Sequence, residues 1–203
     1  MSMIGILALQ GDFQAHAEML SKMEVPTRLV RKGSDLASLS GLILPGGESS
    51  TFLKLMDEEK LWEPLRKFAK DHPVFGTCAG AILMADKVEG PSQQSLGLIR
   101  MTIKRNAYGR QLSSAIRHAD AAKELNIGRK AGPPLEAVLI RAPIITEVGP
   151  DVQVLATMDG QPVVVRQGNY LATTFHPELT SDTRIHRYFT RLVSNDEKDA
   201  GDA

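Results

Sequence analysis

Residues 73–85 read PVFGTCAGAILMA, a short apolar run that breaks at Gly76 and resumes after Gly80 as a stretch typical of a helix. A strand that turns sharply into a helix exposes the residue at its turn, as in a nucleophile elbow, and that residue is Cys78. The glycines permit the cramped backbone. The start of the helix favours a thiolate and leaves the amide of Ala79 to stabilise an oxyanion. The alternative is that Cys78 is a small core residue.

Apolar runs alternate with helical stretches along the first half of the chain. The runs occur at 4–9, 25–30 and 42–44, and the helical stretches at 13–23 and 51–70, the second broken around 56–60. This order, with short connections, predicts an α/β fold with a mostly parallel sheet and helices on both faces. The second half is richer in strands, which we predict at 96–103, 137–140, 152–156, 162–165 and 170–175, before a last helix at 184–193.

The length of 203 residues fits one domain with a sizeable core. We predict a single domain over residues 1–193, followed by a polar, disordered tail over residues 194–203. The segment 117–134 has the least readable pattern, with glycine and prolines near its end. We expect it to be a helix-bearing excursion on the surface.

The charges and the cysteine count exclude several classes of protein. Lys plus Arg equals Asp plus Glu at 24 each, so no net field recruits nucleic acid or an acidic membrane. A single cysteine cannot form an intramolecular disulfide, which fits a reducing compartment. The N-terminus lacks the basic region of a signal peptide, and no apolar run approaches the roughly 20 residues of a membrane span. We therefore expect a cytoplasmic protein.

A second candidate motif, His176-Pro177-Glu178, follows the apolar run 170–175. Residues i and i+2 of an extended segment project to the same side, so Glu178 can orient the imidazole of His176. A cysteine nucleophile needs such a base, and functional groups gather at the carboxyl ends of strands in α/β sheets. A surface turn is the alternative. The remaining histidines lack a comparable partner and are predicted to lie on the surface: His16, His72, His118 and His186.

Two further segments offer groups for binding a substrate. Gly46 and Gly47 follow the run 42–44, and backbone amides can approach a ligand closely there, so Gly47 is a second candidate oxyanion donor. A phosphate-binding loop is the alternative, but the segment lacks the Gly-Lys-Ser/Thr ending of a P-loop. Arg105 and Arg141 are candidates for clamping a carboxylate, unless they belong to solvated turns. No Cys/His cluster has metal-ligand spacing, so neither a metal nor another cofactor is predicted.

Taken together, these motifs resemble the triad (class I) glutamine amidotransferases, with GTCAG at 76–80 as the elbow and HPE at 176–178 as the base and its partner. Four segments are similar to the glutaminase subunits of pyridoxal 5′-phosphate synthase, the PdxT type: LALQGD at 7–12, LPGGES at 44–49, RNAYGRQ at 105–111 and IRAP at 140–143. The chain departs from that pattern after Gln111, where the usual Ser-Phe-Glu is replaced by Ser-Ser-Ala-Ile at 113–116. The departure does not touch the triad.

The resemblance implies a flavodoxin-like three-layer fold and a glutaminase. Cys78 would be the nucleophile, His176 the general base and then acid, and Glu178 its orienting partner. Glutamine would contact Gly46, Gly47, Glu48, Arg105, Ile140 and Arg141, and Gln10 would lie near the exit for ammonia. The implied partner is a (β/α)8-barrel synthase subunit that combines the ammonia with a pentose phosphate and a triose phosphate.

Three other functions stay open at this point. The first is a glutaminase subunit of another pathway, such as imidazole glycerol phosphate or anthranilate synthesis, against which the motifs at 105–111 and 140–143 argue. The second is a stand-alone cysteine peptidase or hydrolase on the same fold, which a screen of peptide substrates tests. The third is a non-enzymatic binding module, which failure of Cys78 to react with a glutamine-analogue electrophile would favour.

Overall fold

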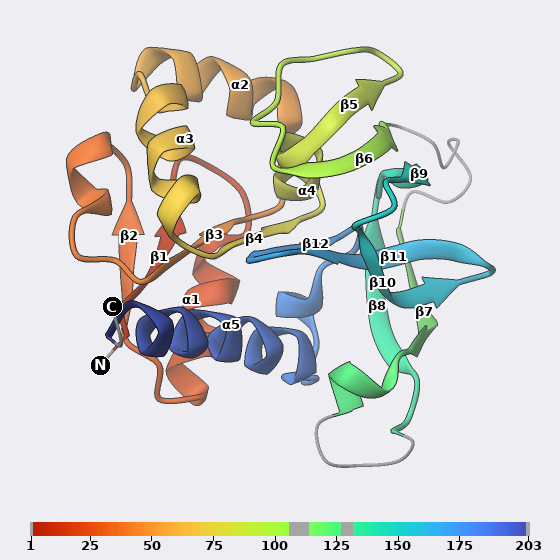
Figure 1. The fold of residues 1–203 in the computed structure, drawn as a ribbon. Coiled ribbons are helices and arrows are strands. Elements are labelled where there is room, and N and C mark those ends of the chain that lie inside the picture. The colour runs from red at the N-terminus through yellow and green to blue at the C-terminus, as the bar shows by residue number, and fades with distance from the viewer. Residues whose placement is uncertain (1, 106–113, 127–131, 202–203) are drawn as a thin grey trace.

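Figure 1 shows a computed structural model of the chain, which describes residues 2–105, 114–126 and 132–201. Its centre is a nine-stranded sheet with the order β2-β1-β3-β4-β12-β11-β10-β7-β8. The first five strands in this order pair in parallel: β2 (Thr27–Val30), β1 (Ile4–Leu7), β3 (Gly41–Leu44), β4 (Val74–Thr77) and β12 (Tyr170–Thr173). The sheet continues from β12 by antiparallel pairing through β11 (Gln161–Gln167), β10 (Gln153–Met158), β7 (Ser114–Ala121) and β8 (Leu135–Ile140).

Helices cover both faces of the parallel half of the sheet (Figure 1). One face carries α1 (Phe13–Lys22) and α5 (Arg184–Gly201), and the other carries α2 (Ser49–Glu58), α3 (Trp62–Asp71) and α4 (Ala79–Met84). A separate three-stranded sheet lies beside α4 and consists of β5 (Ala85–Glu89), β6 (Ile99–Lys104) and β9 (Ile144–Val148). Short 3-10 turns complete the order: η1 (Gly33–Leu36), η3 (Lys123–Asn126) and η4 (Pro177–Leu179).

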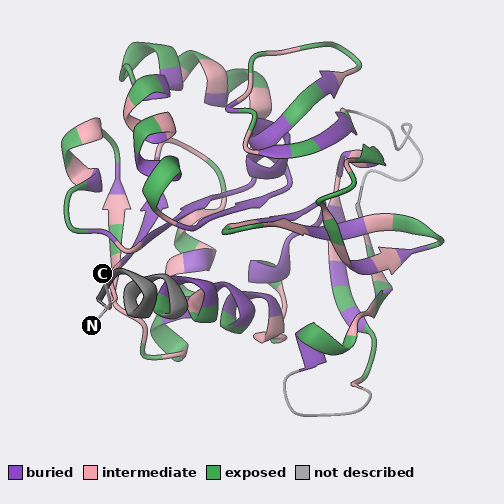
Figure 2. Cartoon of the chain, in the orientation of Figure 1, coloured by how far each residue is buried: buried purple, intermediate pink, exposed green. Residues whose placement is uncertain are grey.

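The parallel strands are buried on both faces, as their continuous apolar sequences require. On β3, Leu42 and Leu44 belong to the hydrophobic cluster under α2, α3 and α4, while Ile43 belongs to the cluster under α1 and α5. Successive side chains of a strand point to opposite faces, so one strand contributes to both cores. Figure 2 shows these strands as a band of buried residues between the helices. The predicted α/β fold with helices on both faces of the sheet is confirmed.

The predicted break in the second helical stretch has a local cause. Helix α2 ends at Glu58 and α3 begins at Trp62, and between them Lys60 adopts a positive φ of 52°. A left-handed residue ends a helix because it cannot continue the hydrogen-bonded spiral. The indole Nε1 of Trp62 donates to Asp57 Oδ1 at 2.7 Å, which fixes the angle between the two helices.

The expectation for segment 117–134 was wrong in its first part. Residues 114–121 form β7, which pairs with β8 on one side and β10 on the other, and in the described part of the segment the 3-10 turn η3 follows it. Residues 127–131 lie outside the described residues, and β5 and β9 were not predicted at all. The disorder of residues 194–203 stays a prediction, although α5 itself continues past residue 193 to Gly201. Within the described ranges, no helix has both the length and the apolarity needed to cross a bilayer.

Candidate active site

Cys78 stands at the junction between β4, which ends at Thr77, and α4, which begins at Ala79. Its backbone has φ 48° and ψ −104°, a conformation that is costly for a residue with a side chain. The Cys78 amide donates to the carbonyl of Thr173 on β12 at 2.9 Å, which ties the turn to the neighbouring strand. Such strain persists where the surrounding structure fixes it, and it is the geometry of a nucleophile elbow.

Two glycines bring α4 close enough to the sheet to hold this elbow. A Cβ atom on Gly80 would overlap the carbonyl oxygen of Leu44 on β3, and one on Gly76 would lie 2.6 Å from Met84 Sδ. Because β3 is a central strand, it cannot yield to a larger side chain on α4. The glycines therefore fix the position of Cys78 over the carboxyl end of the sheet.

His176 follows β12, and Glu178 lies in η4 directly after it. The imidazole Nδ1 of His176 is 2.7 Å from Glu178 Oε1, and the two residues are only 2% and 6% exposed. A contact of this length between an imidazole and a buried carboxylate is a charge-assisted hydrogen bond. It places a proton on Nδ1 and directs Nε2 away from Glu178, as a triad requires.

The electrostatics of the pair keep a proton on the imidazole. Burial by itself lowers the pKa of His176, but hydrogen bonds to Cys78 and Glu178, and the negative charges of both, outweigh it and raise the pKa to about 10. Burial raises the pKa of Glu178, while the hydrogen bond and charge of His176 act in the opposite direction. His176 is therefore protonated at neutral pH, which suits a thiolate–imidazolium pair with Cys78.

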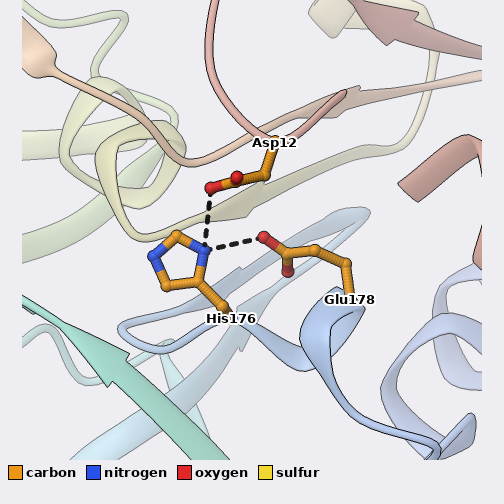
Figure 3. Close-up of side chains that lie close together, drawn as sticks. All are labelled: Asp12, His176 and Glu178. Atoms are coloured by element: carbon orange, nitrogen blue, oxygen red, sulfur yellow. Dashed lines mark hydrogen bonds and ion pairs between the residues drawn. The ribbon is translucent and has the colours of Figure 1, made fainter. Parts of the chain in front are cut away.

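A second carboxylate faces the same imidazole nitrogen (Figure 3). Asp12, in the loop between β1 and α1, places Oδ2 3.4 Å from His176 Nδ1, and its side chain is 38% exposed. The ligand atoms of Asp12, His176 and Glu178 lie within 4.8 Å of one another, so the group has donors of the kind that hold a metal ion. Because Nδ1 already carries a proton toward Glu178, the arrangement suits acid–base chemistry better. Asp12 ends the motif LALQGD at 7–12, but no role at the site was predicted for it, and the absence of a metal stays a prediction.

Cys78 opens into a cavity of about 450 Å³ at the carboxyl ends of the parallel strands. Most of the residues predicted from sequence line it: Gly47, Glu48, Cys78, Ala79, Arg105, Ile140, Arg141 and His176. The lining also includes residues that were not predicted: Gly11, Asp12, Ser49, Ser50 and Ile82. The Cys78 sulfur lies 3.9 Å from the carbonyl oxygen of Ile140, so the end of strand β8 lies beside the elbow.

Gly46 lies beside the imidazole of His176 and does not itself line the cavity. A Cβ atom at this position would be 2.9 Å from His176 Nδ1 and closer still to Cε1. Gly47 has a φ of 152°, and a Cβ atom there would run into the side-chain amide of Gln10. The first glycine thus makes room for the imidazole of His176, and the second allows the loop to pass against Gln10.

Gln10 binds the backbone of the same loop with both ends of its amide. Its Oε1 accepts from the Glu48 amide at 3.2 Å, and its Nε2 donates to the Glu48 carbonyl at 3.3 Å. The Glu48 carboxylate turns the other way and caps α2, accepting from the amides of Ser50 at 3.0 Å and Thr51 at 2.7 Å. Hydrogen bonds from Thr51 and Ser50 lower the pKa of Glu48 to about 2. The carboxylate is therefore engaged in the helix cap.

The two arginines predicted to clamp a carboxylate both reach the cavity. Arg105 donates from Nη2 to Ser49 Oγ at 2.7 Å, which holds its guanidinium against the start of α2. Arg141 has a positive φ of 47°, directly after β8. The rest of the motif that begins at Arg105, residues 106–111, lies outside the described residues.

A comparison with known families agrees with this geometry. The model of the SNO glutamine amidotransferase family matches residues 6–195, a range that contains the elbow, the base and its carboxylate. The chain belongs to this family. The family predicted from the sequence motifs is therefore confirmed.

Curated relatives are similar to this chain along nearly their whole length. The chain is 52% identical over 192 residues to the pyridoxal 5′-phosphate synthase subunit PdxT of Koribacter versatilis, and the match covers 95% of this chain and 96% of that protein. The subunit of the same name from Solibacter usitatus is 48% identical over 189 residues, with 93% and 98% covered. A crystal structure of a glutamine amidotransferase superposes with a TM-score of 0.85 at 42% identity, covering 94% of this chain and 98% of that one.

The amidotransferase buries two histidines that the sequence analysis wrongly placed on the surface. His16 on α1 and His186 on α5 have no exposed area, whereas His118 is exposed and His72 is half-buried. Their helical spacing carried a signal, because His16 shares the buried face of α1 with Met19 and Leu20. The prediction gave more weight to the polar character of the residue type than to its position on the helix.

Proposed function

We propose that this chain is a glutaminase that hydrolyses L-glutamine to glutamate and ammonia through Cys78, His176 and Glu178. The observation that supports it most directly is the 2.7 Å contact between His176 Nδ1 and Glu178 Oε1 beside a cysteine whose strained turn opens into a cavity. A nucleophile, its base and an orienting carboxylate are the groups that amide hydrolysis by covalent catalysis needs. Membership of an amidotransferase family supports the same reaction.

In the first step, the Cys78 thiolate attacks the carbon of the side-chain carboxamide and forms the C–S bond of a tetrahedral intermediate. The amides of Gly47 and Ala79, which both line the cavity, stabilise its oxyanion. The imidazolium of His176 then gives its proton to the nitrogen as the C–N bond breaks, and ammonia leaves. A glutamyl thioester remains on Cys78.

In the second step, neutral His176 takes a proton from water, and the resulting hydroxide attacks the thioester carbon. Collapse of this second intermediate breaks the C–S bond, releases glutamate and restores the thiolate beside the protonated imidazole. Glu178 keeps its carboxylate toward Nδ1 throughout, so the imidazole ring stays oriented in both steps. The proton that the first step uses is thus replaced by the second.

The walls of the cavity offer groups for the amino-acid part of glutamine. The guanidinium of Arg105, held by Ser49, suits a bidentate contact with the α-carboxylate. The carbonyl of Ile140, the segment at Arg141 and the backbone of Glu48 supply polar contacts around it. Gly46 and Gly47 shape the loop that faces the reacting carboxamide.

We further propose that the ammonia passes to a (β/α)8-barrel synthase subunit that makes pyridoxal 5′-phosphate, and that the chain works in the cytoplasm. The names of the curated relatives support the pathway, and the single cysteine supports a reducing compartment. We assign Gln10 to the exit because it contacts the loop that carries Gly47 but does not itself line the cavity. We expect docking of the synthase to turn a peptide in the loop 45–47 and so complete the oxyanion site. The chain would then hydrolyse glutamine only while the synthase is bound, and no ammonia would be lost to solvent.

The test is ammonia release from glutamine by the purified chain, alone and with the synthase subunit, with Cys78→Ala as the control. We expect activation by the synthase and loss of all turnover in the variant. Activity without any effect of the synthase would overturn the partner and keep the triad. No activity in either sample, together with failure of Cys78 to react with a glutamine-analogue electrophile, would overturn the proposed reaction.

A further inference from the structure

A chain of buried polar side chains continues from the triad into the core between α1 and α5. His16 on α1 places Nε2 3.5 Å from Glu178 Oε2 and 3.2 Å from the hydroxyl oxygen of Thr77, the residue before the nucleophile. Its other nitrogen, Nδ1, is 3.0 Å from His186 Nε2 on α5. The triad mechanism uses neither histidine, yet both are fully buried.

Both buried histidines are neutral. Burial, followed by the charges of His186 and His176, holds the pKa of His16 well below its ordinary value, and burial lowers the pKa of His186 to about 4. The titratable groups that face His16 are His186 from α5 and Glu178 and His176 from the segment after β12. Each neutral imidazole has one N–H donor and one acceptor nitrogen, so the chain has a direction.

The unpartnered atoms of the chain determine that direction. Among the described residues, the buried atoms without a hydrogen-bond partner include Glu178 Oε2 and His186 Nδ1. If His16 carried its proton on Nδ1, it would donate to His186 Nε2, which would then have to be the acceptor nitrogen of that ring. The proton of His186 would therefore sit on its other nitrogen, the unpartnered Nδ1. That would bury a donor without an acceptor and turn the lone pair of His16 Nε2 toward the Glu178 carboxylate, and both are costly.

The opposite arrangement leaves only one imidazole lone pair without a partner. His186 Nε2–H donates to His16 Nδ1, and His16 Nε2–H then points to Thr77 Oγ1 and Glu178 Oε2. At 3.5 Å the contact with Glu178 is not a hydrogen bond, but it brings the N–H dipole of His16 next to the buried carboxylate oxygen. Glu178 thus has a hydrogen-bond donor, His176, at Oε1, and the N–H of His16 faces Oε2 as a longer polar contact.

We propose that His16 is a positioning residue for the glutaminase reaction: its Nε2–H, fixed by His186, holds the Glu178 carboxylate charged and turned toward His176. This inference deepens the proposed function and rests on it, because it concerns the same triad. A donor at Oε2 stabilises the carboxylate against the cost of burial and prevents its rotation away from the imidazole. The groups that face His176 are then Cys78, Glu178 and Asp12, of which Glu178 alone depends on His16.

The kinetic test compares His16→Leu, which removes the donor, with His16→Gln, whose amide nitrogen reaches the position of Nε2. Without the donor, Glu178 favours the imidazolium less, so the alkaline limb of the pH profile of kcat/KM moves down by about one pH unit. We expect kcat with the synthase to fall about ten-fold in His16→Leu while KM changes by less than about two-fold, and most of the loss to be restored in His16→Gln.

The matched control is Phe189→Leu. It removes packing from the face of α5 that carries His186, since the rings of His186 and Phe189 both contact Phe75. It should lower the thermal midpoint as His16→Leu does and leave the alkaline limb in place. An unshifted limb in His16→Leu, or an equal shift in Phe189→Leu, would overturn the positioning role.

A second measurement does not depend on activity. Nitrogen-15 NMR of the histidine rings in the unmodified chain reads the tautomer of His16 directly. We expect the Nε2–H form, neutral between pH 6 and 9. A proton on Nδ1, or a charged ring, would overturn the inference even if the glutaminase reaction is correct. Conversely, an inactive chain with the expected tautomer would overturn the reaction and leave the hydrogen-bond chain intact.

Discussion

Replacing Gly46 by alanine tests how tightly the catalytic base is confined. Gly46 lies in the loop after β3, and its α-carbon faces the imidazole of His176. A Cβ atom there would be 2.9 Å from Nδ1 and 3.3 Å from Nε2, and ordinary contacts begin at 3.4 Å. Since Cε1 lies nearer still, the ring must move by roughly 1 Å, and a misplacement of that size costs about 10²-fold in rate.

The ring has little freedom to make this movement harmlessly. His176 is 2% exposed, and its Nδ1 is held by Glu178 at 2.7 Å, so a displaced ring loses its alignment with that carboxylate or with Cys78. Moving the loop instead would break the hydrogen bond from the Asp12 amide to the Gly46 carbonyl at 3.2 Å. We expect the strain to lower the free energy of unfolding by about 1–3 kcal/mol.

The assay is ammonia release from glutamine with the synthase present, combined with urea denaturation. Gly46→Ala should lose about 100-fold in kcat with little change in KM, because the residue does not line the cavity. The control is Gly33→Ala, where the new Cβ atom meets only the side chain of Pro64, at 3.0 and 3.2 Å. If Gly46→Ala turns over glutamine as fast as Gly33→Ala, the proposed confinement of His176 is wrong.

Three further predictions concern other parts of the chain. Arg105→Met should raise the KM for glutamine about 10- to 100-fold with a small effect on kcat, since a charged clamp on a substrate carboxylate contributes roughly 1.5–3 kcal/mol; steady-state kinetics measure this, and an unchanged KM would contradict the assignment. Glu48→Ala should lower stability by about 1 kcal/mol at pH 7 through loss of the α2 cap, as seen by thermal unfolding; the pKa of about 2 means that this contribution is present above pH 4.5 and is lost as the pH falls through about 2. His186 has a folded pKa of about 4, below its ordinary 6.5, so the unfolded chain binds the extra proton and stability falls as the pH drops from 6.5 to 4. Urea denaturation of His186→Leu should show a shallower fall over that window, by up to about 1.4 kcal/mol per pH unit, and an unchanged slope would mean that His186 is not buried neutral.

The first half of the fold is predictable from sequence because its central strands are short, continuous apolar runs and its helices show a clear apolar face. The apolar runs at β1, β3 and β4 lie between helices with clear faces, and the turn at Cys78 combines a strand end, two glycines and a helix start. Strand β7 is different. Its sequence, SAIRHADA, is rich in alanine, its Ile116 is 68% exposed, and its pairing partners are distant in sequence. Only the assembled sheet shows that Ala119 is buried.

The candidate site likewise contains residues that a local motif indicates and residues that only the folded chain brings together. The roles predicted for Cys78, His176 and Glu178 rest on residue type and local motif, and the structure brings Cys78 and His176 to one cavity with Glu178 2.7 Å from the imidazole. Asp12 and His16 acquire their surroundings from residues more than 160 positions away, and no local pattern encodes that meeting. The helix period could have placed His16 on a buried face, but not beside the carboxylate of Glu178.

The side-chain amide of Gln10 pairs with the backbone of Glu48 as two residues of neighbouring β-strands do. It donates to the Glu48 carbonyl at 3.3 Å and accepts from the Glu48 amide at 3.2 Å. The loops after β1 and β3 are therefore joined at this point, although Gln10 and Glu48 are 38 positions apart in the sequence. A molecule that displaces Gln10 in the first loop would therefore also shift the peptide of Glu48, next to Gly47. The proposed oxyanion donor, Gly47, is thus linked to the first loop by a side chain that takes no part in the proposed chemistry.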